Sequence, residues 1–184
     1  MGSVRPSYLI VLVVVILFVV YLKVSNPYRE YSTSKYWQSA TVESVRDIPD
    51  EALKEGNKNG PVLMWAAIGA TDPKILYALV ERGSSINESD GIFKGTPLTG
   101  AAGYSKSPEI ISALIKLGAE VDKTVYGGET ALMIAARYNS SKGIISKLIF
   151  HGANAQIKNA SGQTALDIAK KVKNDIAIRE LNGT

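Results

Sequence analysis

A fixed pattern of hydrophobic positions recurs along the chain from about residue 60. In three copies a leucine is followed three and four residues later by alanines, as in Leu132 with Ala135 and Ala136, and a fourth copy keeps the first of them, Leu166 with Ala169. This spacing places the three side chains on one face of a helix. The copies follow one another at 34 or 35 residues, a period that indicates stacked supersecondary units. They start at Pro61, Thr96, Thr130 and Thr164.

The residues at these starting positions predict where each helix begins. Threonine favours the N-cap because its hydroxyl accepts a hydrogen bond from a backbone N–H of the first turn. We therefore expect Thr96, Thr130 and Thr164 to cap three helices. Pro97 suits the first turn, where its missing N–H would have no helical partner anyway. Pro61 stands in the threonine position of the first copy and offers no such cap.

A second short helix is predicted in each unit. Asp72-Pro73 and Ser107-Pro108 combine an N-cap residue with a first-turn proline, the usual start of a helix. Glycine ends helices because it adopts a positive φ at the C′ position without strain. The glycines placed to do so are Gly83, Gly118 and Gly152. Helices this short cannot bury a core alone, so neighbouring units must stack on one another.

These repeated segments resemble the ankyrin repeat, which has two helices in about 33 residues and a Thr-Pro-Leu-His-x-Ala start. The resemblance runs from about residue 60 to residue 174. It implies an all-α ankyrin-repeat solenoid of about four repeats over residues 61–184, made of helix-turn-helix units and loops. We expect residues 41–60 to add an N-terminal half-repeat, and the unit that starts at Thr164 to be a polar C-terminal cap.

The histidine of the family motif is absent from every copy. Its place is taken by Met64, Thr99, Met133 and Asp167. The resemblance implies that this histidine normally joins a hydrogen-bond network, so we expect the turns of this array to be less rigid.

An uncharged apolar run occupies residues 8–22 and reaches residue 24 if the Lys23 side chain extends to the interface. A membrane-spanning helix needs about 17–25 apolar residues. We therefore expect a single-pass transmembrane signal-anchor helix at 8–24, after an N-terminal tail at 1–7. A cleaved signal peptide and a buried core helix stay open as alternatives. The first lacks a small-x-small cleavage site after the run.

The orientation of this segment stays open. Lysine and arginine counts around the run slightly favour a repeat domain in the cytoplasm. A short N-terminal tail before a signal-like run favours an exported repeat domain, periplasmic or extracytoplasmic, and this is the orientation we favour. Residues 25–40 are expected to be a juxtamembrane linker. In it, Tyr36 and Trp37 either lie at the headgroup layer or cover the end of the first repeat.

The net charge of +4 lies mostly outside the repeats. Residues 1–40 contain four basic residues and one acidic residue, and the rest of the chain contains 17 basic and 16 acidic residues. A nearly neutral repeat domain has no phosphate-binding footprint, which argues against nucleic acid as a partner.

The resemblance implies a protein partner bound by the loop tips and by the exposed face of the first helices. That face includes Ile68, Gly69 and Gly103 among the positions after the paired small residues. Aromatic residues and arginine are enriched among the residues that contribute most binding energy. The candidate protein-binding residues are accordingly Phe93, Tyr104, Tyr126, Arg137 and Tyr138. Phe93 and Tyr126 could instead fold back over the loop backbone.

Few residues suit catalysis. His151, the only histidine, precedes the helix-ending Gly152, a position that suits a helix C-terminus. The acids between residues 43 and 55 are interpreted as a solvated face rather than a metal site. The chain has no cysteine, phosphate-binding loop or zinc spacing. We therefore expect no enzyme activity, cofactor, metal or small-molecule substrate.

The leading hypothesis is a membrane-tethered ankyrin-repeat protein–protein interaction module, acting as an adaptor or scaffold. The alternative is an immunity or inhibitor protein that neutralises a toxin or lipase at the membrane, a type that short anchored ankyrin proteins resemble.

Overall fold

The computed structural model describes residues 28–54, 61–89 and 95–183. The chain divides into two compact units, residues 1–30 and residues 31–184. Only residues 28–30 of the first unit are described, so the fold reported below is that of the second unit.

Every regular element in the described ranges is a helix. The N-terminal elements are the 3-10 helix η1 (Arg29–Ser32), α2 (Ser34–Ser39), α3 (Val42–Arg46) and α4 (Asp50–Lys54). The central elements are α5 (Val62–Gly69), α6 (Lys74–Glu81), α7 (Pro97–Tyr104) and α8 (Pro108–Lys116). The C-terminal elements are the 3-10 turn η2 (Tyr126–Gly128), α9 (Ala131–Tyr138), α10 (Ile144–Phe150), α11 (Ala165–Val172) and α12 (Asp175–Asn182).

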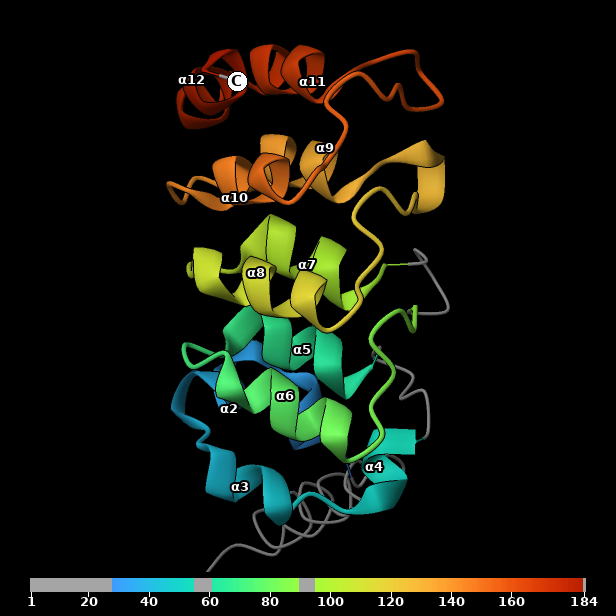
Figure 1. Cartoon of the computed structure of the whole chain (residues 1–184), viewed down its shortest axis with the longest axis vertical. Helices are drawn as coiled ribbons and strands as arrows, with labels where there is room; N and C mark the ends of the chain where they lie inside the picture. The colour runs from blue at the N-terminus through green and yellow to red at the C-terminus, as the bar shows by residue number, and fades with distance from the viewer. Residues whose placement is uncertain (1–27, 55–60, 90–94, 184) are drawn as a thin grey trace, which may run out of the picture. The chain divides into compact units, whose positions relative to one another are not determined.

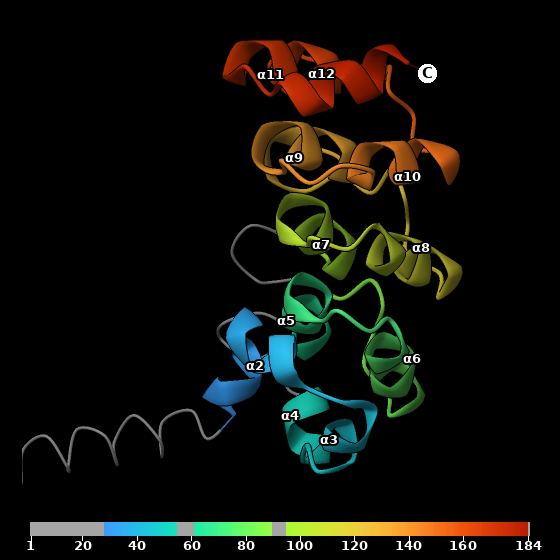
Figure 2. The same cartoon turned by 90° about the vertical axis from the view of Figure 1, so that its left-hand side faces the viewer.

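The helices form antiparallel pairs that stack as successive layers (Figure 1). We call α5, α7, α9 and α11 the first helices and α6, α8, α10 and α12 the second helices. First helices pack on first helices and second helices on second helices, so the two sets form two columns (Figure 2). The described part of residues 61–184 is therefore an all-α stack of helix pairs, as the ankyrin resemblance predicted.

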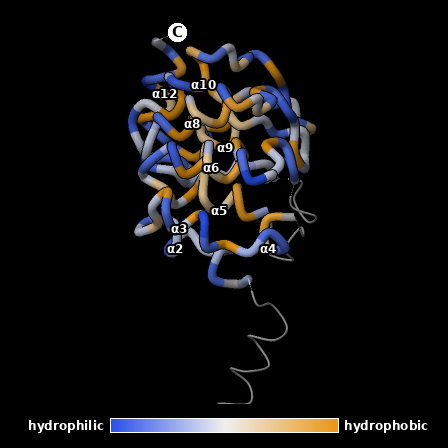
Figure 3. The backbone as a smooth tube through the Cα atoms, turned by 60° about the horizontal axis from the view of Figure 1, so that its bottom comes forward, coloured by the Kyte–Doolittle hydropathy of each residue, from blue (hydrophilic) through white to orange (hydrophobic). Residues whose placement is uncertain are grey.

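The core lies between the two columns and between the layers. The paired small residues of the first helices are 0% exposed, including Ala101, Ala102, Ala135 and Ala136. Small side chains allow the backbones of neighbouring first helices to approach closely, as in other tightly packed helix interfaces. Apolar segments gather along the middle of the stack and hydrophilic segments occupy the turns (Figure 3).

The predicted threonine caps are confirmed. The hydroxyl oxygens of Thr96, Thr130 and Thr164 accept hydrogen bonds from the backbone N–H three residues later. Helix α5 starts after Pro61 without a side-chain cap.

The expected loosening of the turns by the missing histidine is offset in two repeats. Thr99 and Asp167 stand at two of the four histidine positions, and each side chain accepts a hydrogen bond from the cap residue's backbone N–H, at 2.8 and 2.9 Å. These reciprocal bonds complete a capping box.

The backbone and hydroxyl hydrogen bonds from Thr164 hold the pKa of the Asp167 carboxyl below its usual value. The stabilisation from this cap is therefore present at neutral pH and is lost as the pH falls through the lowered pKa.

The predicted glycine stops of the second helices are also confirmed. Gly83, Gly118 and Gly152 have φ of 98°, 98° and 92°. The residue after each glycine donates its N–H to the carbonyl of a leucine in the helix, at 3.0 Å in all three repeats. This bond is part of the Schellman motif and satisfies a carbonyl that the helix end would leave without a partner.

Asparagine side chains join consecutive repeats. Asn139, which is 5% exposed, donates to the carbonyls of Ala102 and Ser105 at 2.9 and 3.0 Å. Asn174 makes the equivalent bonds to Ala136 and Asn139 one repeat later, at 3.1 and 2.8 Å. Carbonyl groups at the ends of the first helices thus find partners in the next repeat, as buried polar groups require.

The N-terminal end of the array is covered by two helices, α2 from the expected linker at 25–40 and α3 from the expected half-repeat at 41–60. Helix α2 packs against α5, and α3 packs against α6, in the places of a further first and second helix. Trp37 of α2 is 0% exposed, and its indole N–H donates to the Tyr31 carbonyl at 2.9 Å. Trp37 therefore covers the end of the first repeat, which is one of the two roles that the sequence left open. The sequence of α2 has no helical apolar period, which is why the helix was not expected.

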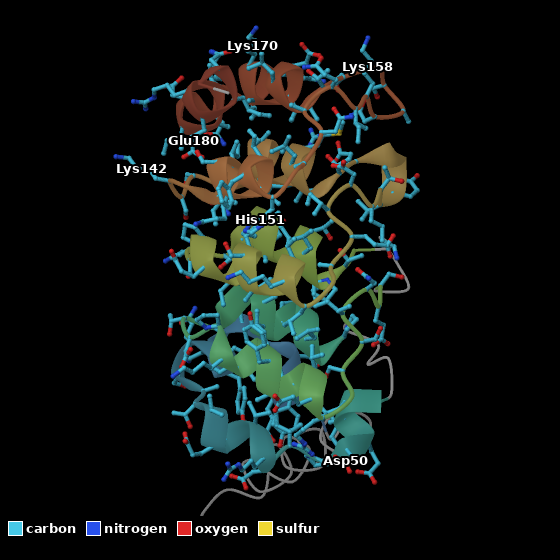
Figure 4. All side chains as sticks on the ribbon, in the orientation of Figure 1. Asp50, Lys142, His151, Lys158, Lys170 and Glu180 are labelled. Carbon is cyan, nitrogen blue, oxygen red and sulfur yellow. The ribbon has the colours of Figure 1, made fainter. Side chains whose placement is uncertain are left out.

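Two long-range contacts hold the ends of the array. At one end the Arg82 guanidinium of α6 donates to the carbonyls of Val45 and Ile48 and pairs with Asp50. At the other end the Glu180 carboxylate of α12 accepts the Gly143 N–H at 2.7 Å and the Ser146 N–H at 2.9 Å (Figure 4). Glu180 therefore caps α10, which has no side-chain cap of its own.

Among the described residues, no helix has both the length and the apolar character needed to cross a membrane. The predicted signal-anchor helix at 8–24 lies outside these residues, so it stays a prediction.

Replacing Gly69 with alanine should detach α2 from α5. A Cβ at Gly69 would lie 2.2 Å from the backbone carbonyl oxygen of Ser34, which cannot move without shifting α2. We expect the variant to lower the free energy of unfolding by about 1–3 kcal/mol, measured by urea denaturation.

The matched control is Gly103→Ala in α7. A Cβ there would approach one side-chain methyl group, Cγ2 of Ile134, at 3.0 Å and no backbone atom. Both variants gain the helix preference of alanine over glycine, about 1 kcal/mol, so their difference isolates the contact with α2. Equal stabilities would contradict this packing.

Candidate protein-binding surface

The most prominent exposed feature is a pair of stacked tyrosines on the first helices. Tyr104 and Tyr138 are the last residues of α7 and α9, and their rings stack with centroids 5.9 Å apart and an interplanar angle of 24°. The rings are 59% and 55% exposed. Two large amphipathic rings held in one orientation form a surface that can bind a partner at low cost in side-chain entropy.

The same helix position has a different role in the outer repeats. In α5 it is Gly69, which is buried under α2 and is not part of the exposed face that we expected. In α11 it is Val172, which is 41% exposed.

Arg137 is held beside this pair. Its guanidinium forms an ion pair with Glu129, the residue just before the Thr130 cap of the same helix. It also lies 5.9 Å from the centroid of the Tyr138 ring, within the range of a cation–π contact. The ion pair holds the Arg137 side chain in place beside the Tyr138 ring. We call Tyr104, Arg137 and Tyr138 the tyrosine ridge.

The structure does not bring the other two candidates into the tyrosine ridge. Tyr126 is 76% exposed at the tip of the loop that leads into α9. The loop joins the N-terminal end of α9, whereas Tyr138 is at its C-terminal end, about 10 Å further along the axis. The exposure of Tyr126 argues against the alternative in which its ring folds over the loop. Phe93 lies outside the described residues.

Neighbouring loop tips are joined by backbone contacts. The N–H of Ala160 donates to the carbonyl of Gly127 at 2.9 Å, and Gly128 lies against the backbone of Asn159. Gly127 and Gly128 have φ of 77° and 71°, which glycine tolerates far better than other residues. The loop that carries Tyr126 is thereby positioned by the next repeat.

A shallow groove of about 890 Å³ lies beside Tyr104. Helices α2 and α5 and the turn after α7 form its walls. We call it the N-terminal groove, and its lining residues are Ser34, Gln38, Trp65, Ile68, Gly69, Ala70, Thr71, Tyr104, Lys106 and Ser107. Sequence reasoning missed this groove because it depends on α2. A glycine at a helix position occupied by tyrosine in the next two repeats was the signal that another element packs there.

The residues considered for chemistry are placed apart from the tyrosine ridge. The His151 ring lies between α10 and α8, where its Nε2 is 3.1 Å from the Ser112 hydroxyl (Figure 4). It follows the last residue of α10, as the sequence predicted. Asp50 of the acidic segment pairs with Arg82. Among the described residues, no group of three or more acids or histidines is placed to hold a metal ion.

Comparison with known proteins identifies the class. The family model described as "Ankyrin repeats (3 copies)" matches residues 63–159, more than half of the chain. The chain belongs to the ankyrin repeat family. Ankyrin repeats generally bind protein partners, and the family is typically a non-catalytic interaction module. A search of curated proteins found no match.

The tyrosine ridge should contribute little to folding. We expect Tyr104→Ala and Tyr138→Ala each to lower the free energy of unfolding by less than about 2 kcal/mol, because the ring stack contributes about 0.5–1.5 kcal/mol and more than half of each residue is already exposed. Leu132→Ala, at a core position that is 1% exposed, should cost about 2–5 kcal/mol. Urea denaturation of the three variants tests the difference. A tyrosine variant as unstable as Leu132→Ala would assign the ridge to the core.

Proposed function

We propose that this protein is a membrane-tethered adaptor or scaffold that binds a protein partner through the tyrosine ridge and has no catalytic activity. The observation that carries the proposal is the stacked Tyr104–Tyr138 pair, with both rings more than half exposed on consecutive repeats. Aromatic side chains beside an arginine are the composition expected at the centre of a binding surface. The ion pair of Arg137 with Glu129 supports a preformed surface.

The tether rests on the apolar run at residues 8–24. A single anchor would confine the repeat domain to the membrane surface. This raises its effective concentration toward any partner in or on the same membrane without a new contact. We propose that the repeats lie on the exported side.

Site-specific photocrosslinking in cells tests the binding surface. A photoreactive amino acid at Tyr104 or at Tyr138 should trap the same protein partner, because the two rings are in contact. The matched control position is Lys116, exposed on a second helix and outside the tyrosine ridge. Arg137→Ala should weaken both crosslinks several-fold, as expected for a residue at the centre of an interface.

The outcome that would contradict the proposal is crosslinking from Lys116 alone, or from no position. The identity of the trapped protein also separates the two functional hypotheses. A toxin or lipase whose activity is blocked by binding would favour the inhibitor alternative over the adaptor.

Removal of residues 8–24 tests the tether separately. We expect the full chain to sediment with membranes and the shortened chain to be found in the soluble fraction, because residues 8–24 have about the length that a membrane-spanning helix needs. A reporter fused to Thr184 then gives the side of the membrane. Full-length protein in the soluble fraction would contradict the tether but not the binding surface.

A further inference from the structure

We infer that the N-terminal groove holds a short acidic segment of the protein partner, with an apolar side chain against Trp65 and Ile68 and a carboxylate at Lys106. The inference rests on the proposed function, because it assigns a chemical class to one part of the partner.

The floor and walls of the groove suit an apolar side chain. Trp65 and Ile68 are half-buried side chains of α5, and Tyr104 forms the side toward the next repeat. The volume of about 890 Å³ lies within the range of about 300–1,000 Å³ typical of ligand sites. This is enough for a few residues of an extended peptide.

The positive charge of Lys106 favours an acidic residue in the bound segment. Lys106 is the one charged residue in the groove lining, it is exposed, and none of the ion pairs between described residues includes it. Neither acid next to the lining residues in sequence, Asp72 or Glu109, forms an ion pair with Lys106. The Asp72 carboxylate accepts the Lys74 N–H at 2.9 Å, and the Glu109 carboxylate accepts the Ser107 hydroxyl at 3.0 Å. A carboxylate of the partner would supply the opposite charge for Lys106.

Polar groups at the rim suit a peptide backbone. Ser34 and Gln38 of α2, with Thr71 and Ser107 on the opposite turns, offer hydroxyl and amide groups along the groove. An apolar centre with a polar rim is the usual composition of a protein–protein contact. The groove exists because Gly69 admits α2, so this chain has a binding position that the tyrosines alone would not provide.

Selection of displayed random short peptides on the purified full chain in detergent micelles tests the inference. We expect the recovered peptides to be enriched in Asp and Glu beside Leu, Ile or Phe. Their affinity, measured by fluorescence anisotropy, should fall by at least about fivefold in Trp65→Ala and in Lys106→Glu. Added salt should weaken binding to the wild type and much less to Lys106→Glu.

The matched control is Lys142→Glu, which reverses an exposed lysine in the corresponding turn of the next repeat, outside the groove lining. It should change the affinity by less than about twofold. Because Lys106 is exposed, its variant keeps the test valid even if Trp65→Ala fails to fold.

Three results would overturn the inference: no acidic enrichment, equal effects of Lys106→Glu and Lys142→Glu, or no binder that depends on Lys106. Peptides that lose affinity only in Tyr138→Ala would support the tyrosine ridge and overturn the groove. Loss of the photocrosslinks from Tyr104 and Tyr138 would instead overturn the proposed function itself, so the two failures are distinguishable.

Discussion

The close approach of consecutive first helices is the constraint on which the rest of the structure depends. Fully buried alanines, such as Ala101 and Ala135, let these helices approach closely, and larger side chains such as Ile134 pack beside them. Each helix is too short to be stable alone, so its stability comes from the neighbouring layers. The threonine caps, glycine stops and asparagine bridges all satisfy backbone groups that this stacking brings out of water.

Features set by residues a few positions apart could be predicted from the sequence. The threonine caps and the positive-φ glycines follow from local chemistry that is the same in every repeat. Contacts between distant residues could not be predicted in this way. Helix α2 has no apolar period, and Arg82 reaches carbonyls more than 30 residues away in the chain. The tyrosines were identified by their repeat position, but the groove needed α2 and was therefore missed.

One helix position shows how structure and function divide within the array. The last residue of each first helix is Gly69, Tyr104, Tyr138 or Val172. At the N-terminal end the absence of a side chain lets α2 close the stack, and in the middle two large rings remain exposed. In the middle repeats the side chain at this position projects outside the core, which buried residues such as Leu98, Ala101 and Leu132 build. A solenoid can therefore acquire a binding surface without altering the packing that holds it together.

The cap that Glu180 provides for α10 has a consequence for how the chain folds during synthesis. A protein leaves the ribosome from its N-terminus, and repeats can fold as they emerge. Helix α10 would emerge complete, yet the carboxylate that accepts the Gly143 and Ser146 N–H groups is made 34 to 37 residues later. The N-terminus of α10 therefore gains this side-chain cap only after α12 has been made. Until then, water must satisfy these N–H groups.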